Sequence, residues 1–220
     1  MATPAPRQRP TLDQSGRALG PRALATRRRL LEATAKLLGE RSVRDVSVVE
    51  IAREAGTSPA TFYQYFKDAN EATLVLAEDA ADEMPAVMEG LDGTFEGRDG
   101  LERARGLVDA FLRHWDRHRP VLLVRNLAAD EGDRDFMRVR QKAMTPMLSR
   151  LAEQVAKGQR AGRVDPAIVP QAAAAALGSI LDRLAAYHQS VQRMGVTRDE
   201  LVDTTARIIL QTLGGAAPTA

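Results

Sequence analysis

The stretch over residues 47–74 constrains the fold most, because signals that start and stop helices follow one another there at short intervals. Ser47 and Glu50 have the spacing of a capping box, which opens a short helix that ends at Gly56. Ser58, followed by a proline, opens a second short helix. Two short helices joined across a glycine predict a helix-turn-helix unit.

The rest of the chain shows helical periodicity and no convincing strand, which predicts an all-α protein. We expect three parts: a disordered basic tail over 1–20, a helix-turn-helix domain over 21–68, and a helical ligand-binding and dimerisation domain over 69–220. The expected helices begin at Pro21 and further cover 48–55, 59–66, 69–89 with a kink at Pro85, 101–118, 121–130, 133–157 with a kink at Pro146, 166–194 and 197–213.

Basic charge gathers at one end of the chain. Residues 1–70 hold 12 Lys and Arg against 7 Asp and Glu, whereas residues 71–220 hold 19 against 22. This asymmetry fits a polyanionic partner at the N-terminal end, and it equally fits a solvated basic tail. The chain has no cysteine and no apolar leader in its first 30 residues, so we expect a cytoplasmic protein without disulfides or thiolate metal sites.

The 47–74 segment reads SVVEIAREAGTSPATFYQYFKDANEATL and resembles the DNA-binding domain of the tetracycline-repressor (TetR) family. The positions that carry the resemblance are Ser47, Ile51, Ala52, Ala55, Gly56, Thr61, Phe62, Tyr63, Tyr65, Phe66 and Asp68. Two departures stand out. Ala69 replaces the lysine that commonly follows the cap of the next helix, and Val48 and Val49 occupy the start of the first short helix.

The second short helix separates into an apolar inner face and an outer face rich in hydroxyl, amide and ammonium groups. By resemblance, this element lies in the DNA major groove and Gln64 reads a base edge. Thr61, Tyr63, Tyr65 and Lys67 are the expected phosphate contacts. The full set of expected DNA-contacting residues is Arg27, Ser47, Thr57, Ser58, Thr61, Tyr63, Gln64, Tyr65 and Lys67.

Large apolar residues recur from Met84 to Leu151, and methionine-rich patches suit a cavity for an apolar ligand. Core packing is the simpler explanation for any single one of them. The residues expected to bind a ligand are Met88, Phe111, Trp115, Leu122, Asn126, Met144, Met147, Leu148 and Tyr187. By resemblance, such a ligand releases the protein from its DNA operator.

His114 and His118 have the spacing of metal ligands on one helix. No third ligand stands out in the sequence, and charged residues surround the pair. We therefore expect no metal site and no cofactor, with the two histidines on a solvated or lightly packed face.

Five consecutive alanines at 172–176 precede a leucine-rich helix, and the last helix carries a broad apolar face. The resemblance implies that these two helices form a homodimer interface, whereas packing within one subunit explains the same pattern. The expected interface residues are Ala173, Leu177, Leu181, Leu184, Thr205, Ile208 and Ile209.

An enzyme of helical architecture is the main competing reading. The sequence shows no glycine-rich phosphate loop, no nucleophile elbow and no obvious acid–base pair, so we expect no catalytic residues. A DNA-binding protein without a ligand, or an activator of the same fold, stays open as an alternative to a ligand-released repressor.

Overall fold

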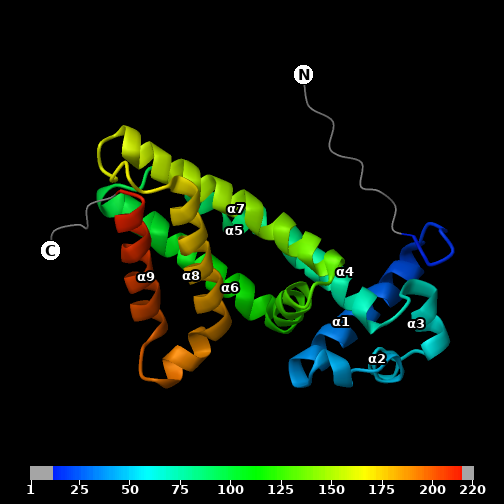
Figure 1. Cartoon of the computed structure of the whole chain (residues 1–220). Coiled ribbons are helices and arrows are strands. Elements are labelled where there is room, and N and C mark those ends of the chain that lie inside the picture. Colours follow the sequence, from blue (N-terminus) through cyan, green and yellow to red (C-terminus); the bar gives the residue numbers. More distant parts are fainter. Residues whose placement is uncertain (1–11, 215–220) are drawn as a thin grey trace. The chain divides into compact units, whose positions relative to one another are not determined.

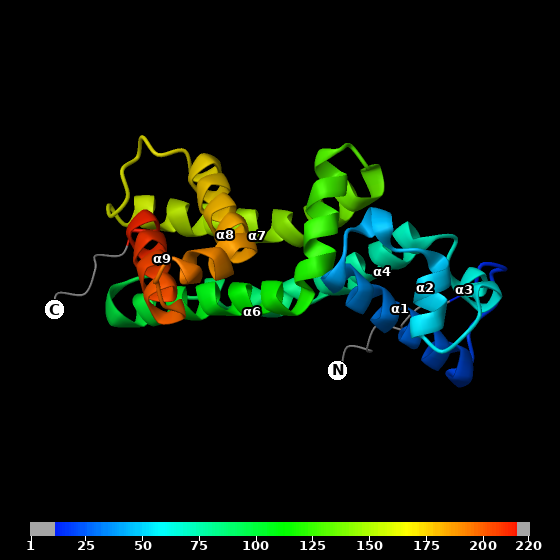
Figure 2. The same cartoon turned by 90° about the horizontal axis from the view of Figure 1, so that it is seen from below.

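The computed structural model describes residues 12–214, and Figures 1 and 2 show them as a set of helices. No strand occurs within this range; there is one isolated bridge, between Leu12 and Ala18. The prediction of an all-α protein is therefore confirmed. The chain forms two compact units, of which the first ends at Ala77 and the second begins at Glu78. The helix α4 (Ala69–Asp82) contributes residues to both units.

The first unit is built on a long helix followed by two short ones. Leu30, Ile51 and Phe62 are fully buried, one on each of these helices, and form the centre of its core. Its elements are α1 (Pro21–Glu40), the 3-10 turn η1 (Val43–Asp45), α2 (Val48–Glu54) and α3 (Pro59–Tyr65).

The capping signals act as the sequence predicts. The Ser47 hydroxyl accepts a hydrogen bond from the Glu50 amide at 3.3 Å, and the Glu50 carboxylate accepts one from the Ser47 amide at 3.1 Å. Gly56 follows α2 with φ +65°, a conformation that glycine adopts without steric cost. The Ser58 hydroxyl accepts from the Thr61 amide at 3.2 Å and caps α3. The turn between α2 and α3 is thus set by local chemistry.

The second unit is centred on α6, which packs against α7, α8 and α9, while α8 packs on α7 as well (Figures 1 and 2). Trp115, Phe111, Phe136 and Met147 are almost completely buried in its core. Its elements are α5 (Met84–Val87), the 3-10 turn η2 (Glu89–Leu91), α6 (Gly97–Asp130), α7 (Arg134–Arg160), α8 (Pro170–Arg193) and α9 (Arg198–Thr212).

Several expected helix boundaries are wrong, including the start of α6, which lies at Gly97 and not at residue 101. The helix expected over 69–89 ends at Asp82 and restarts as the short α5, because Pro85 lacks an amide donor and suits a first turn. The break expected before residue 121 does not occur. Instead, α6 runs through Pro120 and bends partway along its length (Figure 2), with Val121 and Leu122 buried just beyond the proline. The helix expected from residue 166 starts at Pro170.

The expected disorder of the tail is wrong for its second half. The Asp13 carboxylate accepts hydrogen bonds from the amides of Ser15 and Arg17, both at 2.9 Å, and closes a turn. The Gln14 amide then donates to the Gln64 carbonyl at 3.0 Å, so the turn lies against the end of α3. The first half of the expected tail, residues 1–11, lies outside the described residues.

No helix within residues 12–214 combines the length and the apolar character that crossing a membrane requires.

Candidate nucleic-acid interface and effector groove

One side of α3 is held in the core and the other faces solvent. Phe62 is fully buried and stacks at a tilt on Phe66, with ring centroids 5.4 Å apart. Tyr63, directly after Phe62, is 53% exposed, and Gln64 is exposed beside it. Thr61 is half-buried on the preceding turn. The buried phenylalanines fix the roll of the helix, so the phenol and amide groups of the next two residues point outward.

The remaining residues expected to contact DNA surround this exposed face. Lys67 is exposed just beyond the end of α3, and Tyr65 and Thr57 are half-buried. Ser47 and Ser58 are exposed, but the hydroxyl of each already caps a helix. These two residues therefore position the helices, and their free capacity for a phosphate is reduced.

Arg27 lies on α1 with its guanidinium 5.1 Å from the centroid of the Phe66 ring. This half-buried cation–π contact ties α1 to the end of α3. The arginine thus has a structural role in addition to the expected DNA contact.

A segment that the sequence analysis missed adds to this surface. The Gln14 side-chain amide donates to the Glu71 carboxylate at 3.1 Å and to the Tyr65 carbonyl at 3.3 Å. Asp13 and Arg17 line a hollow together with Gln64 and Tyr65. The run Asp-Gln-Ser-Gly at 13–16 is a turn signal that could have indicated this local order.

An ion pair stabilises the start of α2. The Arg41 guanidinium lies 2.7 Å from the Glu50 carboxylate. This contact, together with the Ser47 hydroxyl, lowers the pKa of Glu50 to about 2. The capping carboxylate is therefore charged at neutral pH, and its charge favours the N-terminus of α2.

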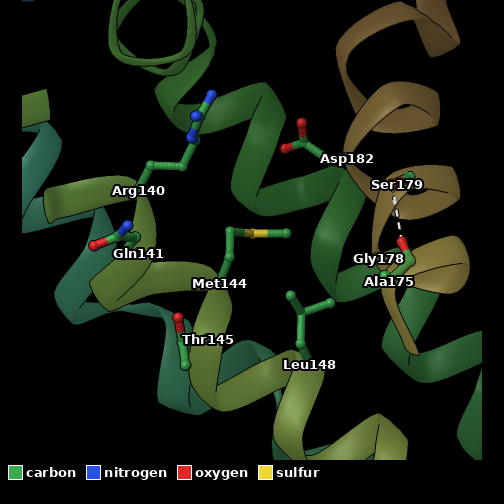
Figure 3. Close-up of a pocket in the computed structure, with 9 residues that line it drawn as sticks. All are labelled: Arg140, Gln141, Met144, Thr145, Leu148, Ala175, Gly178, Ser179 and Asp182. Atoms are coloured by element: carbon green, nitrogen blue, oxygen red, sulfur yellow. Dashed lines mark hydrogen bonds between the residues drawn. The ribbon is translucent and has the colours of Figure 1, made fainter. Parts of the chain in front are cut away.

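A groove runs between α7 and α8 in the second unit. Figure 3 shows Met144 and Leu148 reaching from α7 towards Gly178 and Asp182 on α8. A Cβ atom on Gly178 would lie 2.5 Å from a methyl carbon of Leu148, so this glycine allows the two helices to approach. The hollow measures about 340 Å³. A second hollow of about 470 Å³ shares Leu148 with it and continues along the same helix pair.

The groove has a polar end. Two guanidinium nitrogens of the buried Arg125 donate to the Asn126 side-chain oxygen at 3.1 and 2.9 Å, and the Asn126 amide donates to Asp182 at 3.3 Å. Burial raises the pKa of Asp182 and lowers that of Arg125 to about 10. The structure thus places Asn126 in a polar chain from α6 to α8. Asp182, the one carboxylate in α8, was the sequence signal for it.

The other residues expected to bind a ligand are not brought together around this groove. A subset is almost wholly buried in the core, with exposures of 2% or less: Met88, Phe111, Trp115, Leu122 and Met147. Tyr187 is 41% exposed, and the Arg183 guanidinium lies 4.0 Å from its ring centroid. Of the expected set, Met144 and Leu148 line the groove.

Some of the residues expected at the dimer interface are buried within the subunit, and others are at least partly exposed. Leu177, Leu181, Thr205 and Ile209 are buried within the subunit, so they are not available to a partner. Ala173 and Leu184 are half-buried and Ile208 is 42% exposed. The sequence pattern identified apolar helices but not the side of each helix that stays open. The open side of α8 and α9 carries Ala172, Ala176, Ile180, Arg183, Tyr187, Thr204, Ile208 and Gln211.

A third ionisable side chain lies close to the histidine pair in the structure. Glu83, between α4 and α5, brings its carboxylate oxygen to 3.0 Å from His118 Nε2 and 3.8 Å from His114 Nδ1. His114 is 4% exposed, not solvated, and its burial lowers its pKa to about 4. The expectation that the pair lies on a solvated or lightly packed face is therefore wrong for His114.

These features define a helix-turn-helix DNA-binding protein whose second, helical unit carries a groove between α7 and α8. The chain belongs to the tetR family of bacterial regulatory proteins: residues 30–71 match the model of that family, and residues 89–220 match the tetracyclin repressor-like C-terminal domain. Members of this family are transcription regulators with a DNA-binding helix-turn-helix and a ligand-binding domain.

Solved structures share the fold. The fatty acid degradation regulator FadR from Bacillus halodurans is 16% identical over 91% of this chain and 98% of its own, with a TM-score of 0.63. FadR from Bacillus subtilis, in complex with stearoyl-CoA, is 15% identical over 85% and 97%, with a TM-score of 0.61. AibR, in complex with isovaleryl coenzyme A and operator DNA, is 16% identical over 84% and 98%, with a TM-score of 0.65.

Proposed function

We propose that this chain is a cytoplasmic, homodimeric transcription repressor that a small, largely apolar molecule releases from its DNA operator. The observation that carries the proposal is the outward face of α3, where Tyr63 and Gln64 are exposed directly beside the buried Phe62. A short helix fixed in roll, with hydrogen-bonding side chains on its open face, suits the major groove.

The proposed contacts to DNA are of two kinds: contacts that recognise a base and contacts to phosphates that position the protein. Gln64 has an amide that pairs with an adenine edge through two hydrogen bonds, so it is our candidate for base recognition. Thr61, Tyr63, Tyr65 and Lys67 carry donors suited to phosphates, which fix register without reading sequence. The turn over 13–17 lies against the end of α3 and brings Arg17 to the same region.

The groove between α7 and α8 is our candidate effector site. Met144, Leu148 and Ala175 supply apolar surface, and Asp182 and Arg140 supply polar groups at one end. The lining also includes Gln141, Thr145 and Ser179, and a volume of a few hundred cubic ångströms is in the range of small-molecule sites. Two structural relatives hold acyl thioesters, stearoyl-CoA and isovaleryl coenzyme A, which supports testing acyl compounds first.

Dimerisation through α8 and α9 would allow one protein dimer to bind a single operator with two α3 helices. A stripe of α8 stays open in the single subunit, including Ala176 and Ile180, and Ile208 is open on α9. Two linked half-sites multiply the modest affinity of one helix-turn-helix.

The experiment joins operator selection to effector titration. Full-length protein selects its operator from random DNA, and the bound sequence is then titrated with acyl-CoA thioesters, free fatty acids and aromatic compounds. We expect one class to lower operator affinity. Met144→Trp fills the groove and should abolish this response while operator affinity is kept. Met194→Trp, at an 82% exposed position, is the matched control. Failure to select any DNA sequence would reject the proposal that the chain is a sequence-specific transcription regulator.

A further inference from the structure

The strongest unexplained feature of the second unit is the cluster of Glu83, His114 and His118. One ligand atom from each of these residues lies within 4.8 Å of the other two. We infer that these three side chains form a binding site for a divalent transition-metal ion such as Zn²⁺, separate from the groove between α7 and α8.

The distances suit tetrahedral coordination. Four ligand atoms about 2.1 Å from a zinc ion stand roughly 3.4 Å from one another. The Glu83 oxygen lies 3.0 Å from His118 Nε2 and 3.8 Å from His114 Nδ1, which brackets that value. The two imidazole centroids are 5.0 Å apart, as expected for residues one helical turn apart on α6. Small side-chain adjustments therefore suffice to admit an ion.

His114 is the second, independent observation. Its side chain is only 3% exposed, yet neither ring nitrogen has a hydrogen-bond partner within the described residues. A buried nitrogen without a partner costs free energy that an ordinary structural histidine avoids. The other buried histidine, His188, shows the contrast, because its ring nitrogens face Asp116 at 3.0 Å and the Ala185 carbonyl at 2.8 Å. A metal ion at Nδ1 would supply one missing partner of His114.

The protein would provide three ligands to the ion. A surface hollow of about 320 Å³, lined by Glu83 and His114, leaves room for a fourth ligand such as water. Two imidazoles and one carboxylate favour zinc, nickel or cobalt, whereas magnesium and calcium prefer oxygen ligands alone. Arg117 opposes the ion, since its guanidinium lies 2.7 Å from the same Glu83 oxygen. Its side chain is 65% exposed, so it can move into solvent when the ion enters.

Full-length protein stripped with a chelator and without DNA is the material for the test. Titration with Zn²⁺ by calorimetry should show one ion per chain, and Co²⁺ should give the intense visible absorption of a tetrahedral site. His118→Gln and Glu83→Gln should weaken binding by more than about 100-fold, since loss of even an outer partner costs about 10–100-fold. His118 is 18% exposed, so this variant avoids opening the core.

Two control variants separate this site from adventitious binding. Arg117→Gln removes the competing cation and should tighten zinc binding, whereas Glu89→Gln changes an exposed carboxylate outside the cluster and should leave it unchanged. Circular dichroism of each metal-free variant checks the fold. Absence of stoichiometric binding by the unaltered protein, or equal binding by His118→Gln, would overturn the inference. Neither result bears on operator binding.

Discussion

Phe62 and Gln64 lie two positions apart on α3 and have opposite environments. Phe62 is fully buried and holds α3 on the core, whereas Gln64 is exposed. At the scale of single residues, stability and recognition are therefore separable within one short helix. Ser47 and Ser58 belong to the structural side of this separation, because their hydroxyls cap the helices that carry the proposed DNA contacts.

Gln64→Ala tests recognition at this scale. We expect it to weaken binding to the selected operator by about 1–3 kcal/mol and to relax the preference at one base position. Its midpoint of thermal unfolding should stay unchanged, while Phe62→Ala should lower the free energy of unfolding by about 3–5 kcal/mol. Binding measured on the operator and on single-base variants decides the question; equal losses on all sequences would show that Gln64 does not read a base.

Glu50 gives a prediction for pH. Its pKa of about 2 in the fold lies below the ordinary value of 4.5 for a glutamate, so its charged form is stabilised by folding. This contribution is complete above pH 4.5 and is lost as the pH falls from 4.5 towards 2. Glu50→Gln should therefore lower stability at neutral pH, and the difference from the unaltered protein should shrink through that window. Denaturant unfolding of both proteins at several pH values measures this difference in the free energy of unfolding. A difference that does not change with pH would contradict the lowered pKa of Glu50.

At the scale of elements, tertiary contacts decide two features: where the turn over 13–17 lies, and which sides of α8 and α9 stay exposed. The turn is anchored on α3 and α4 through Gln14, whose side chain bonds to Tyr65 and Glu71. On α8, Leu177 and Leu181 face the subunit core while Ile180 faces outward. Each element thus packs one face against its own unit and leaves another exposed to solvent.

Truncation of the N-terminal segment tests its part in DNA binding. Removal of residues 1–20 should flatten the slope of log affinity against log salt concentration, because fewer counterions are released. Removal of residues 1–11 keeps the turn anchored by Gln14 and is the control that separates the contribution of Arg17. Salt titrations of all three proteins on non-specific DNA give the slopes. Identical slopes would mean that the segment does not contact phosphates.

Substitutions on the last two helices test the dimer interface. Ile208→Asp places a charge at a 42% exposed position and should yield folded monomers, because a charge buried in an interface is costly. Leu181→Asp, at a position that is 1% exposed, should instead unfold the subunit. Sedimentation and circular dichroism distinguish the two results. A folded Ile208→Asp dimer would place the interface elsewhere.

At the scale of the whole molecule, the proposed release of the operator requires that effector binding in one unit changes DNA binding in the other. Coupling of this kind is reciprocal. An effector that lowers operator affinity by a given factor should bind the DNA-free protein more tightly than the DNA-bound protein by that same factor. Calorimetric titration of both forms checks this. Equal effector affinity for the two forms would exclude release by the bound effector.

The sequence alone determined the helix-turn-helix unit, because the Ser47–Glu50 capping box, the Ser58 N-cap and Gly56 act through residues a few positions apart. It also predicted the all-α class through helical periodicity. It failed in three places: Pro120 lies inside α6, the turn over 13–17 lies against α3, and Leu181 faces inward. Only the tertiary structure brought Glu83 to the histidine pair, or Asp182 to Asn126, because these contacts join helices that are far apart in the chain. Periodicity shows that a helix has an apolar face; which neighbour covers that face depends on the packing of the whole unit.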